Sequence, residues 1–494
     1  MIQRRTVLAG GVSALATGAW ANAPERSLRP QARQVGVGVR PLARKTAADI
    51  IAETDIGGDV GFVIADVKTG QVLEAVAPDM ALPPASVTKA ITAIYALEAL
   101  GPTHRYNTRV LATGPVVDGI LEGDLVLAGG GDPTLDTDDL ALLAAAVKDS
   151  GLTQVRGDFY VWGGALPSVD EIDPGQLDHL GYNPSISGLN LNFNRVHFEW
   201  KQNGATYDVT MDARSANYRA DVTVAQMQIV DRGAPVFAYT SDGDIDRWSV
   251  ARGALRRDGS RWLPVRVPAL YAGEVFATFA RSHGIVLKTP KRAQAAPTGR
   301  LLARHQSPPM TVLMQDMLKF STNLTAEVAG ISATQARVSG RRGLRTSALG
   351  MSRWLGDRGV SGEFADHSGL GDTSRIAAGD MVTLLLGNDA FSQLRPLMKP
   401  VKMVDENRKA LPDFDAEVRA KTGTLNFVTT LAGYLRTSGG RDLAFAIFGA
   451  DLEARAAGKR RGDETPAGSA VYNNRVKWLQ QRLLQRWAIL GDLT

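Results

Sequence analysis

The chain contains no cysteine, and this absence removes several kinds of protein from consideration. None of its 494 residues carries a thiol, so a disulfide framework, a thiolate nucleophile and a cysteine-ligated metal are excluded. The 6 histidines are scattered along the chain. His197 and Glu199 would share one face of a strand, where a packed or solvated pair is far commoner than a metal site. We therefore expect no metal site and no cofactor.

Long basic runs are also missing. The formal net charge is +5, and the longest basic run is Lys459-Arg460-Arg461. Proteins that bind nucleic acids concentrate basic residues on one face, so no nucleic-acid partner is expected. After the N-terminus, no apolar stretch is long enough to cross a bilayer. The sequence therefore predicts a mature chain without an integral membrane segment.

The N-terminal residues have the pattern of an export signal. Arg4 and Arg5 precede a short stretch of small and apolar residues, Ala9–Ala19, and an Ala-x-Ala end at Ala23. A charged start, a short apolar centre and small residues at the cleavage site are typical of signal peptides. The paired arginines fit the twin-arginine route, and the Sec route stays open. We predict that residues 1–23 are a signal peptide and that the mature protein lies in the periplasm.

Ser86-Val87-Thr88-Lys89 is the most informative motif of the chain. Residues i and i+3 of a helix share a face, so the amine of Lys89 can reach the hydroxyl of Ser86. A buried lysine with a lowered pKa can take the proton of a serine and make it a nucleophile. Alone, the motif is weak, since most isolated matches are an N-capping serine and a solvated lysine.

Two later motifs favour the catalytic interpretation. Ser321-Thr322-Asn323 follows an apolar stretch, and Lys421-Thr422-Gly423-Thr424 lies in a predicted strand. The order Ser-x-x-Lys, Ser-x-Asn, Lys-Thr-Gly is the signature of penicillin-binding proteins and serine β-lactamases. Each motif is common, but all three in this order are a specific signal. The candidate catalytic residues are Ser86, Lys89, Ser321, Asn323 and Lys421, and the candidate substrate-binding residues are Thr422, Gly423 and Thr424.

The hydrophobic pattern at the two ends of the chain predicts one shared sheet. The elements expected near the start are a helix at 46–56, a hairpin at 60–76 and the Ser86 helix. Those expected near the end are helices at 309–336 and 340–358, strands at 419–425, 430–437 and 442–450, and an amphipathic helix at 471–490. The apolar face of this last helix either packs on the sheet or contacts a membrane surface.

The middle of the chain has another pattern, with short strand-like pieces between glycine and aspartate clusters and one helix near 137–150. Ser86 and Ser321 are 235 positions apart, far more than one compact catalytic domain needs. We predict an α+β fold of the β-lactamase/transpeptidase type, an antiparallel sheet flanked by helices. The predicted parts are a split catalytic domain at 24–105 and 296–494, a β-rich insertion at 106–295 and a nested subdomain at 201–261.

The chain resembles the class C low-molecular-mass penicillin-binding proteins, the D-alanyl-D-alanine carboxypeptidases and endopeptidases of bacterial cell-wall turnover. That family carries two extra domains between its first two motifs, which fits the wide gap. Further similar segments are Gly129–Leu135, Tyr182-Asn183, Leu189–Asn194 and Asp366–Leu370. The chain departs from the family pattern at Thr322, where aspartate is commoner, and at His367, where glycine is commoner.

The resemblance implies a serine mechanism without a cofactor. Ser86 would attack the carbonyl of the penultimate D-alanine of a stem peptide, and Lys89 would act as the general base. Ser321 would pass a proton to the leaving amine, and Asn323 would position Lys89 and the substrate amide. Water would then hydrolyse the acyl-enzyme. The implied partners are peptidoglycan muropeptides as substrates and β-lactams as inhibitors.

The third motif is expected to bind the terminal carboxylate of the substrate. The resemblance implies that Lys421, with Thr422 and Thr424, meets this group. Glu327 lies four residues after Asn323 and is interpreted as a surface or ion-paired residue. His367 is interpreted as a turn or packing residue.

Two other functions stay open. A β-lactamase or esterase can be built on the same scaffold, although no Glu-x-x-Leu-Asn stretch after Ser321 supports the class A mechanism. A catalytically weak cell-wall-binding protein is the second alternative. The presence of every polar catalytic side chain argues against it.

Overall fold

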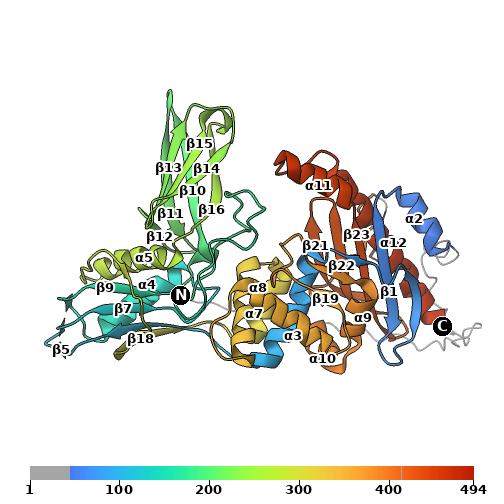
Figure 1. Ribbon diagram of the computed structural model, residues 1–494, viewed down its shortest axis with the longest axis horizontal. Helices are drawn as coiled ribbons and strands as arrows, with labels where there is room; N and C mark the ends of the chain where they lie inside the picture. Colours follow the sequence, from blue (N-terminus) through green and yellow to red (C-terminus); the bar gives the residue numbers. More distant parts are fainter. Residues whose placement is uncertain (1–44, 406, 413, 494) are drawn as a thin grey trace, which may run out of the picture.

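The computed structural model describes residues 45–493 except 406 and 413, so the predicted signal peptide at 1–23 lies outside the described residues. Figure 1 shows an elongated molecule with a large sheet and the C-terminal helices at one end. The other end holds a second sheet, above which long strands stand upright. Within the described part of the chain, no helix has both the length and the apolar character needed to span a membrane.

A five-stranded antiparallel sheet joins the two ends of the described chain. Its strand order is β2-β1-β23-β22-β21. The strands are β1 (Asp59–Asp66), β2 (Val72–Val76), β21 (Glu417–Leu425), β22 (Val428–Arg436) and β23 (Asp442–Ala450). β1 pairs with β23 along its length, from Asp59 opposite Ala450 to Asp66 opposite Leu443. The prediction that both ends of the chain contribute to one sheet is confirmed.

Helices cover both faces of this sheet, which is why its central strand β23 is buried on both sides. On one face lie α2 (Ala47–Thr54) and α12 (Ser469–Leu493), with Leu479, Leu483 and Trp487 packed on the strands. The Trp487 ring meets that of Phe62 edge-on, with centroids 5.6 Å apart. The apolar face of the C-terminal helix is therefore covered by the sheet and does not face a membrane.

The other face of the sheet carries the helices that hold the first two motifs. They are α3 (Thr88–Leu100), α6 (Met310–Phe320), α7 (Asn323–Arg337), α8 (Leu344–Gly356), α9 (Ala378–Leu386) and α10 (Asn388–Leu394). The helical pattern predicted at 309–336 forms two helices, because the chain breaks between α6 and α7 at the second motif. Ser321 ends α6 with φ at +61°, a left-handed conformation that costs a non-glycine residue energy and often marks a functional site.

Strands of the middle of the chain form a second, mixed sheet with the order β17-β9-β7-β4-β18. They are β4 (Asn107–Ala112), β7 (Leu125–Ala128), β9 (Phe159–Trp162), β17 (Lys291–Arg292) and β18 (Arg300–Gln306). We use "inserted region" for residues 107–306, from β4 to β18. β18 pairs with β4, so this sheet includes residues after position 295.

Two helices of the inserted region, α4 (Thr137–Asp149) and α5 (Pro268–Ser282), contribute to its core. The prediction of one helix here was wrong because it missed α5. Between the two helices the chain forms the short strand β8 (Gln154–Val155) and then β9.

The upright strands in Figure 1 belong to two further sheets of the inserted region. One has the order β12-β11-β10-β16, with β10 (Arg195–Asn203), β11 (Thr206–Arg214), β12 (Arg219–Asp221) and β16 (Asp258–Pro264). The other contains β13 (Ala225–Val230), β14 (Phe237–Ser241) and β15 (Asp246–Ala251). Residues 219–230 are therefore divided between these two sheets.

Candidate active site

Ser86 lies in a tight turn of the backbone directly before a buried helix. The 3-10 turn η1 (Ala85–Val87) precedes α3, and Ala85 has φ at +46°. β21 packs closely on this turn, since a Cβ atom on Gly423 would collide with Thr430 Oγ1 and approach the carbonyl of Pro84. Glycine in the third motif therefore lets the strand lie against the first motif.

Lys89 is fully buried beneath Ser86. Its Nζ donates to Ser86 Oγ at 3.0 Å, to Asn323 Oδ1 at 2.7 Å and to the Ser368 carbonyl at 2.8 Å. Burial lowers the pKa of Lys89 to about 8, although nearby Glu327 and Asp366 act to raise it. A charged amine out of water is disfavoured, so this lysine is much closer to neutrality at physiological pH than a surface lysine.

The second and third motifs meet on the other side of Ser86. Lys421 Nζ donates to Ser321 Oγ at 3.0 Å and to the Thr422 carbonyl at 2.7 Å. Burial, and then the positive charge of Lys89, lower the pKa of Lys421 well below its ordinary value. Neither Ser86 nor Ser321 is the N-cap residue that a purely structural role at a helix start would require, because the N-caps of α3 and α7 are Val87 and Thr322.

Ser86, Ser321, Asn323 and Thr424 line a cleft of about 430 Å³. Lys89 and Lys421 lie beneath its wall. Thr422 and Gly423 are not among the cleft-lining residues and instead border a groove beside α12, together with Thr424. The structure thus brings the five candidate catalytic residues together, and of the three candidate substrate-binding residues it places Thr424 in the cleft.

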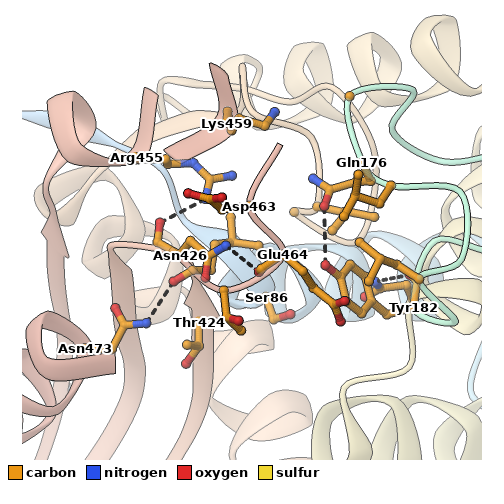
Figure 2. Close-up of a pocket in the computed structure, with 18 of the residues that line it drawn as sticks. Ser86, Gln176, Tyr182, Thr424, Asn426, Arg455, Lys459, Asp463, Glu464 and Asn473 are labelled. Atoms are coloured by element: carbon orange, nitrogen blue, oxygen red, sulfur yellow. Dashed lines mark hydrogen bonds between the residues drawn. The ribbon is translucent and has the colours of Figure 1, made fainter. Parts of the chain in front are cut away.

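The inserted region supplies one wall of the same cleft. Figure 2 shows Gln176 and Tyr182 facing Ser86 from this side, and the Tyr182 carbonyl accepts a hydrogen bond from Asn323 Nδ2 at 2.7 Å. Opposite them, α11 (Leu452–Arg461) contributes Arg455 and Lys459, which both pair with Asp372. The cleft therefore continues from the serine into a charged outer part.

Sequence reasoning missed the turn that closes the site from below. Asp366 accepts backbone hydrogen bonds from Ser368, Gly369 and Gly371, at 2.9, 2.5 and 2.6 Å. This fixes the Ser368 carbonyl, the third partner of Lys89. The family segment Asp366–Leu370 was the available signal, but a backbone carbonyl leaves no mark in a sequence.

The sequence predicts non-catalytic positions for two residues near Lys89, Glu327 and His367. Glu327 is not a surface residue, because it is fully buried and its Oε2 accepts the His367 N–H at 2.9 Å. His367 is a packing residue as expected, with Nε2 2.8 Å from Ser347 Oγ and its ring stacked on Tyr95. Burial lowers the pKa of His367 to about 3, so it is neutral at physiological pH.

A serine hydroxyl in contact with a buried, weakly basic amine is machinery for acyl transfer. The second hydroxyl, Ser321, and the second buried lysine, Lys421, lie across the same cleft. Together with the antiparallel sheet and its helices, the arrangement defines an active-site serine hydrolase of the penicillin-binding class.

Comparison with known proteins gives the same class and narrows it. Residues 43–465 match the D-Ala-D-Ala carboxypeptidase 3 (S13) family. A D-alanyl-D-alanine carboxypeptidase of an Actinomadura species is 30% identical over 425 residues, which cover 79% of this chain and 77% of that protein. The D-alanyl-D-alanine carboxypeptidase DacB of Haemophilus influenzae is 25% identical over 428 residues, 82% of this chain and 88% of that protein.

The solved structures agree on the fold. The crystal structure of penicillin binding protein 4 (dacB) from Haemophilus influenzae superposes with a TM-score of 0.69 at 20% identity, covering 91% of this chain and 99% of that one. The chain belongs to the D-Ala-D-Ala carboxypeptidase 3 (S13) family. It is thus a serine-type carboxypeptidase, and the predicted family and α+β fold are confirmed.

Proposed function

We propose that Ser86 attacks the carbonyl carbon beside a D-alanine of a peptidoglycan stem peptide and forms an acyl-enzyme, and that penicillin acylates the same serine. The observation that carries this proposal is the 3.0 Å contact between Ser86 Oγ and Nζ of the fully buried Lys89. Exposed lysines are protonated at neutral pH and make poor bases, whereas burial favours the neutral amine.

The partners of Lys89 orient it as a base. The Asn323 side-chain oxygen and the Ser368 carbonyl are both acceptors, so they take the two N–H groups of a neutral amine. The lone pair is then directed at the Ser86 hydroxyl. Lys89 takes this proton as the Ser86 oxygen bonds to the substrate carbon.

Ser321 and Lys421 serve the leaving group. The Ser321 hydroxyl, oriented by Lys421, passes a proton to the departing amine, and Thr424 at the wall of the cleft meets the terminal carboxylate. The backbone N–H groups of Ser86 and Thr424 form the oxyanion hole, and losing one such donor costs about 3 kcal/mol in comparable sites.

The substrates that fit are muropeptides, met by the mature protein in the periplasm. Carboxypeptidase and endopeptidase activity break the same D-alanyl bond and differ only in the group that leaves, and both are included in the proposal. The outer part of the cleft, with Gln176 and Tyr182 on one side and Arg455 on the other, leaves room for a peptide beyond the D-alanine. The related Haemophilus protein has been solved with a β-lactam bound, which supports penicillin as an inhibitor.

The test compares wild type with Ser86→Ala. A fluorescent penicillin should label the wild type and leave the variant unlabelled, and mass spectrometry of digested muropeptides should detect D-alanine release by the wild type alone. Labelling of Ser86→Ala would overturn the assignment. Fast loss of the label would instead support a β-lactamase, and absence of peptide cleavage would support a cell-wall-binding protein.

A further inference from the structure

The proposed mechanism gives no role to the buried carboxyl group of Glu327. Glu327 lies on α7, one turn after Asn323, and is fully buried. Its Oε2 accepts the His367 N–H at 2.9 Å, and its Oε1 has no hydrogen-bond partner within the described residues. A buried carboxylate is costly unless it is neutralised or compensated by nearby charge. Packing alone therefore does not account for an acid at this position.

Glu327 contacts the two elements that hold Lys89. Two of the lysine's three hydrogen-bond partners are Asn323, on the same helix as Glu327, and the Ser368 carbonyl, in the turn that Glu327 binds at His367. We use "lysine-holding turn" for residues 366–371. A carboxyl group that joins α7 to this turn fixes the distance between two of the acceptors that orient the amine.

The charges around Lys89 are few and come from three elements. They are Glu327 from α7, Asp366 from the lysine-holding turn and Lys421 from β21. His367, in the same turn, is neutral at physiological pH because burial lowers its pKa to about 3. Glu327 and Lys89 are both fully buried, so solvent screens the charge of one from the other only weakly.

The two groups titrate together. Burial, and then the charge of Asp366, raise the pKa of Glu327 to about 8, although the His367 N–H, the Ser368 side chain and Lys89 act to lower it. The pKa of Lys89 is also about 8, and ionised Glu327 raises it. The ionisation of each group therefore affects that of the other. Protonation of Glu327 removes a negative charge that holds Lys89 in its ammonium form.

We propose that Glu327 is a positioning residue for the acylation step: its buried carboxyl group fixes the lysine-holding turn against α7 and sets the charge state of Lys89. The proposal rests on the proposed function, in which Lys89 is the base for Ser86. It assigns no contact between Glu327 and the substrate.

The test is the pH dependence of acylation by a fluorescent penicillin in wild type and Glu327→Gln. Glutamine keeps the shape and an acceptor for His367 N–H but removes the charge that stabilises the lysine ammonium. The acid limb of the rate profile should therefore move to lower pH, by about one unit. Glu327→Asp restores a carboxylate and should bring the limb back toward its wild-type position.

The control is Thr334→Val on the same helix, where Thr334 is buried and bonds Tyr95 Oη at 3.0 Å. This variant should lower the melting temperature and leave the acid limb in place. An unmoved limb in Glu327→Gln, or the same shift in Glu327→Asp, would overturn the proposal, since a purely structural role lowers the rate without moving the limb.

A second measurement covers the case in which Glu327→Gln does not fold. In wild type labelled with carbon-13 at the lysine Cε, the Lys89 signal, assigned by its loss in Lys89→Arg, should titrate in two steps because Glu327 is coupled to it. A single step would overturn the coupling. Labelling of Ser86→Ala would instead refute the proposed function, and the titration of Lys89 would still report on Glu327.

Discussion

The region around the five-stranded sheet and the inserted region differ in how they place charged lysine and arginine side chains. Within the described residues, both buried lysines, Lys89 and Lys421, lie outside the inserted region. In the inserted region, exposed arginines form ion pairs at the surface, such as Arg247 with Asp242 and Arg252 with Asp231. Exposed pairs contribute little to stability, whereas burying a cation is costly. Both buried lysines lie at the candidate active site, where they contact Ser86 and Ser321.

The inserted region contacts the active-site cleft without contributing a buried lysine to it. The inserted region reaches the cleft with an exposed tyrosine, Tyr182, a glutamine, Gln176, and a backbone carbonyl. It does not place a buried cation there. We infer that the region around the sheet performs the chemistry, while the inserted region shapes access to it. Four substitutions test this comparison.

The largest effect is expected for Lys89→Ala. Without a base, acylation by penicillin should slow by about 10³-fold or more, the range of general-base contributions. The matched control is Arg247→Ala in the inserted region, which removes an exposed cation and its ion pair. Its acylation rate should stay within about twofold of wild type and its stability within about 0.5 kcal/mol. Stopped-flow labelling and thermal melts measure both, and equal losses in the two variants would erase the proposed difference.

Asp366→Asn should have the next largest effect, on stability and rate together. The carboxylate accepts several backbone N–H groups of the lysine-holding turn, and an amide nitrogen facing such donors leaves some unsatisfied. Hydrogen bonds to charged groups contribute about 1.5–3 kcal/mol each, so a loss of about 3 kcal/mol in denaturant unfolding is expected. The control Asp231→Asn, at the surface of the inserted region, should unfold as wild type does; an unchanged Asp366→Asn would mean that the turn does not depend on its charge.

The sequence predicted the site well where its geometry is local or periodic. Ser86 and Lys89 meet because residues three apart share a helical face, and the strand at 417–425 follows from its alternating pattern. The partners that are backbone atoms, above all the Ser368 carbonyl, could not be predicted, since any residue type carries them. Glu327 was misplaced at the surface because an acid on a helix is usually solvated; its burial depends on the tertiary packing of α7 on the lysine-holding turn.

The fold shows the same limit. The sheet was predicted because its strands have strong apolar patterns at both ends of the chain. Helix α5 was missed within a region rich in strand-like pieces, although two signals were present. Pro268 stands in its first turn, where proline is favoured, and Tyr271, Val275 and Phe279 recur at four-residue steps. The break at Ser321 has no pattern of its own, because a left-handed serine is imposed by its surroundings.

Ser321→Ala tests the link between the second and third motifs. Removing the hydroxyl leaves the Thr422 carbonyl as the remaining hydrogen-bond acceptor of buried Lys421 among the described residues. It also takes away the proton relay. Acylation should fall by about 10²-fold, at the lower end of acid–base contributions. The control Ser438→Ala removes a surface hydroxyl that bonds Asp492, and its rate should match wild type. A rate for Ser321→Ala within a few-fold of wild type would remove Ser321 from the mechanism.

Tyr182→Ala should have the smallest effect, and it should depend on the substrate. The side chain is about half exposed and faces the cleft beside Gln176, whereas the bond to Asn323 uses the Tyr182 carbonyl and survives the substitution. Penicillin, which is small, should acylate the variant at nearly the wild-type rate. A cross-linked muropeptide extends further along the cleft and loses an aromatic contact, so its KM should rise by about tenfold. Kinetics with both substrates decide the matter: equal losses would place Tyr182 in the chemical step and erase the division of labour between the two regions.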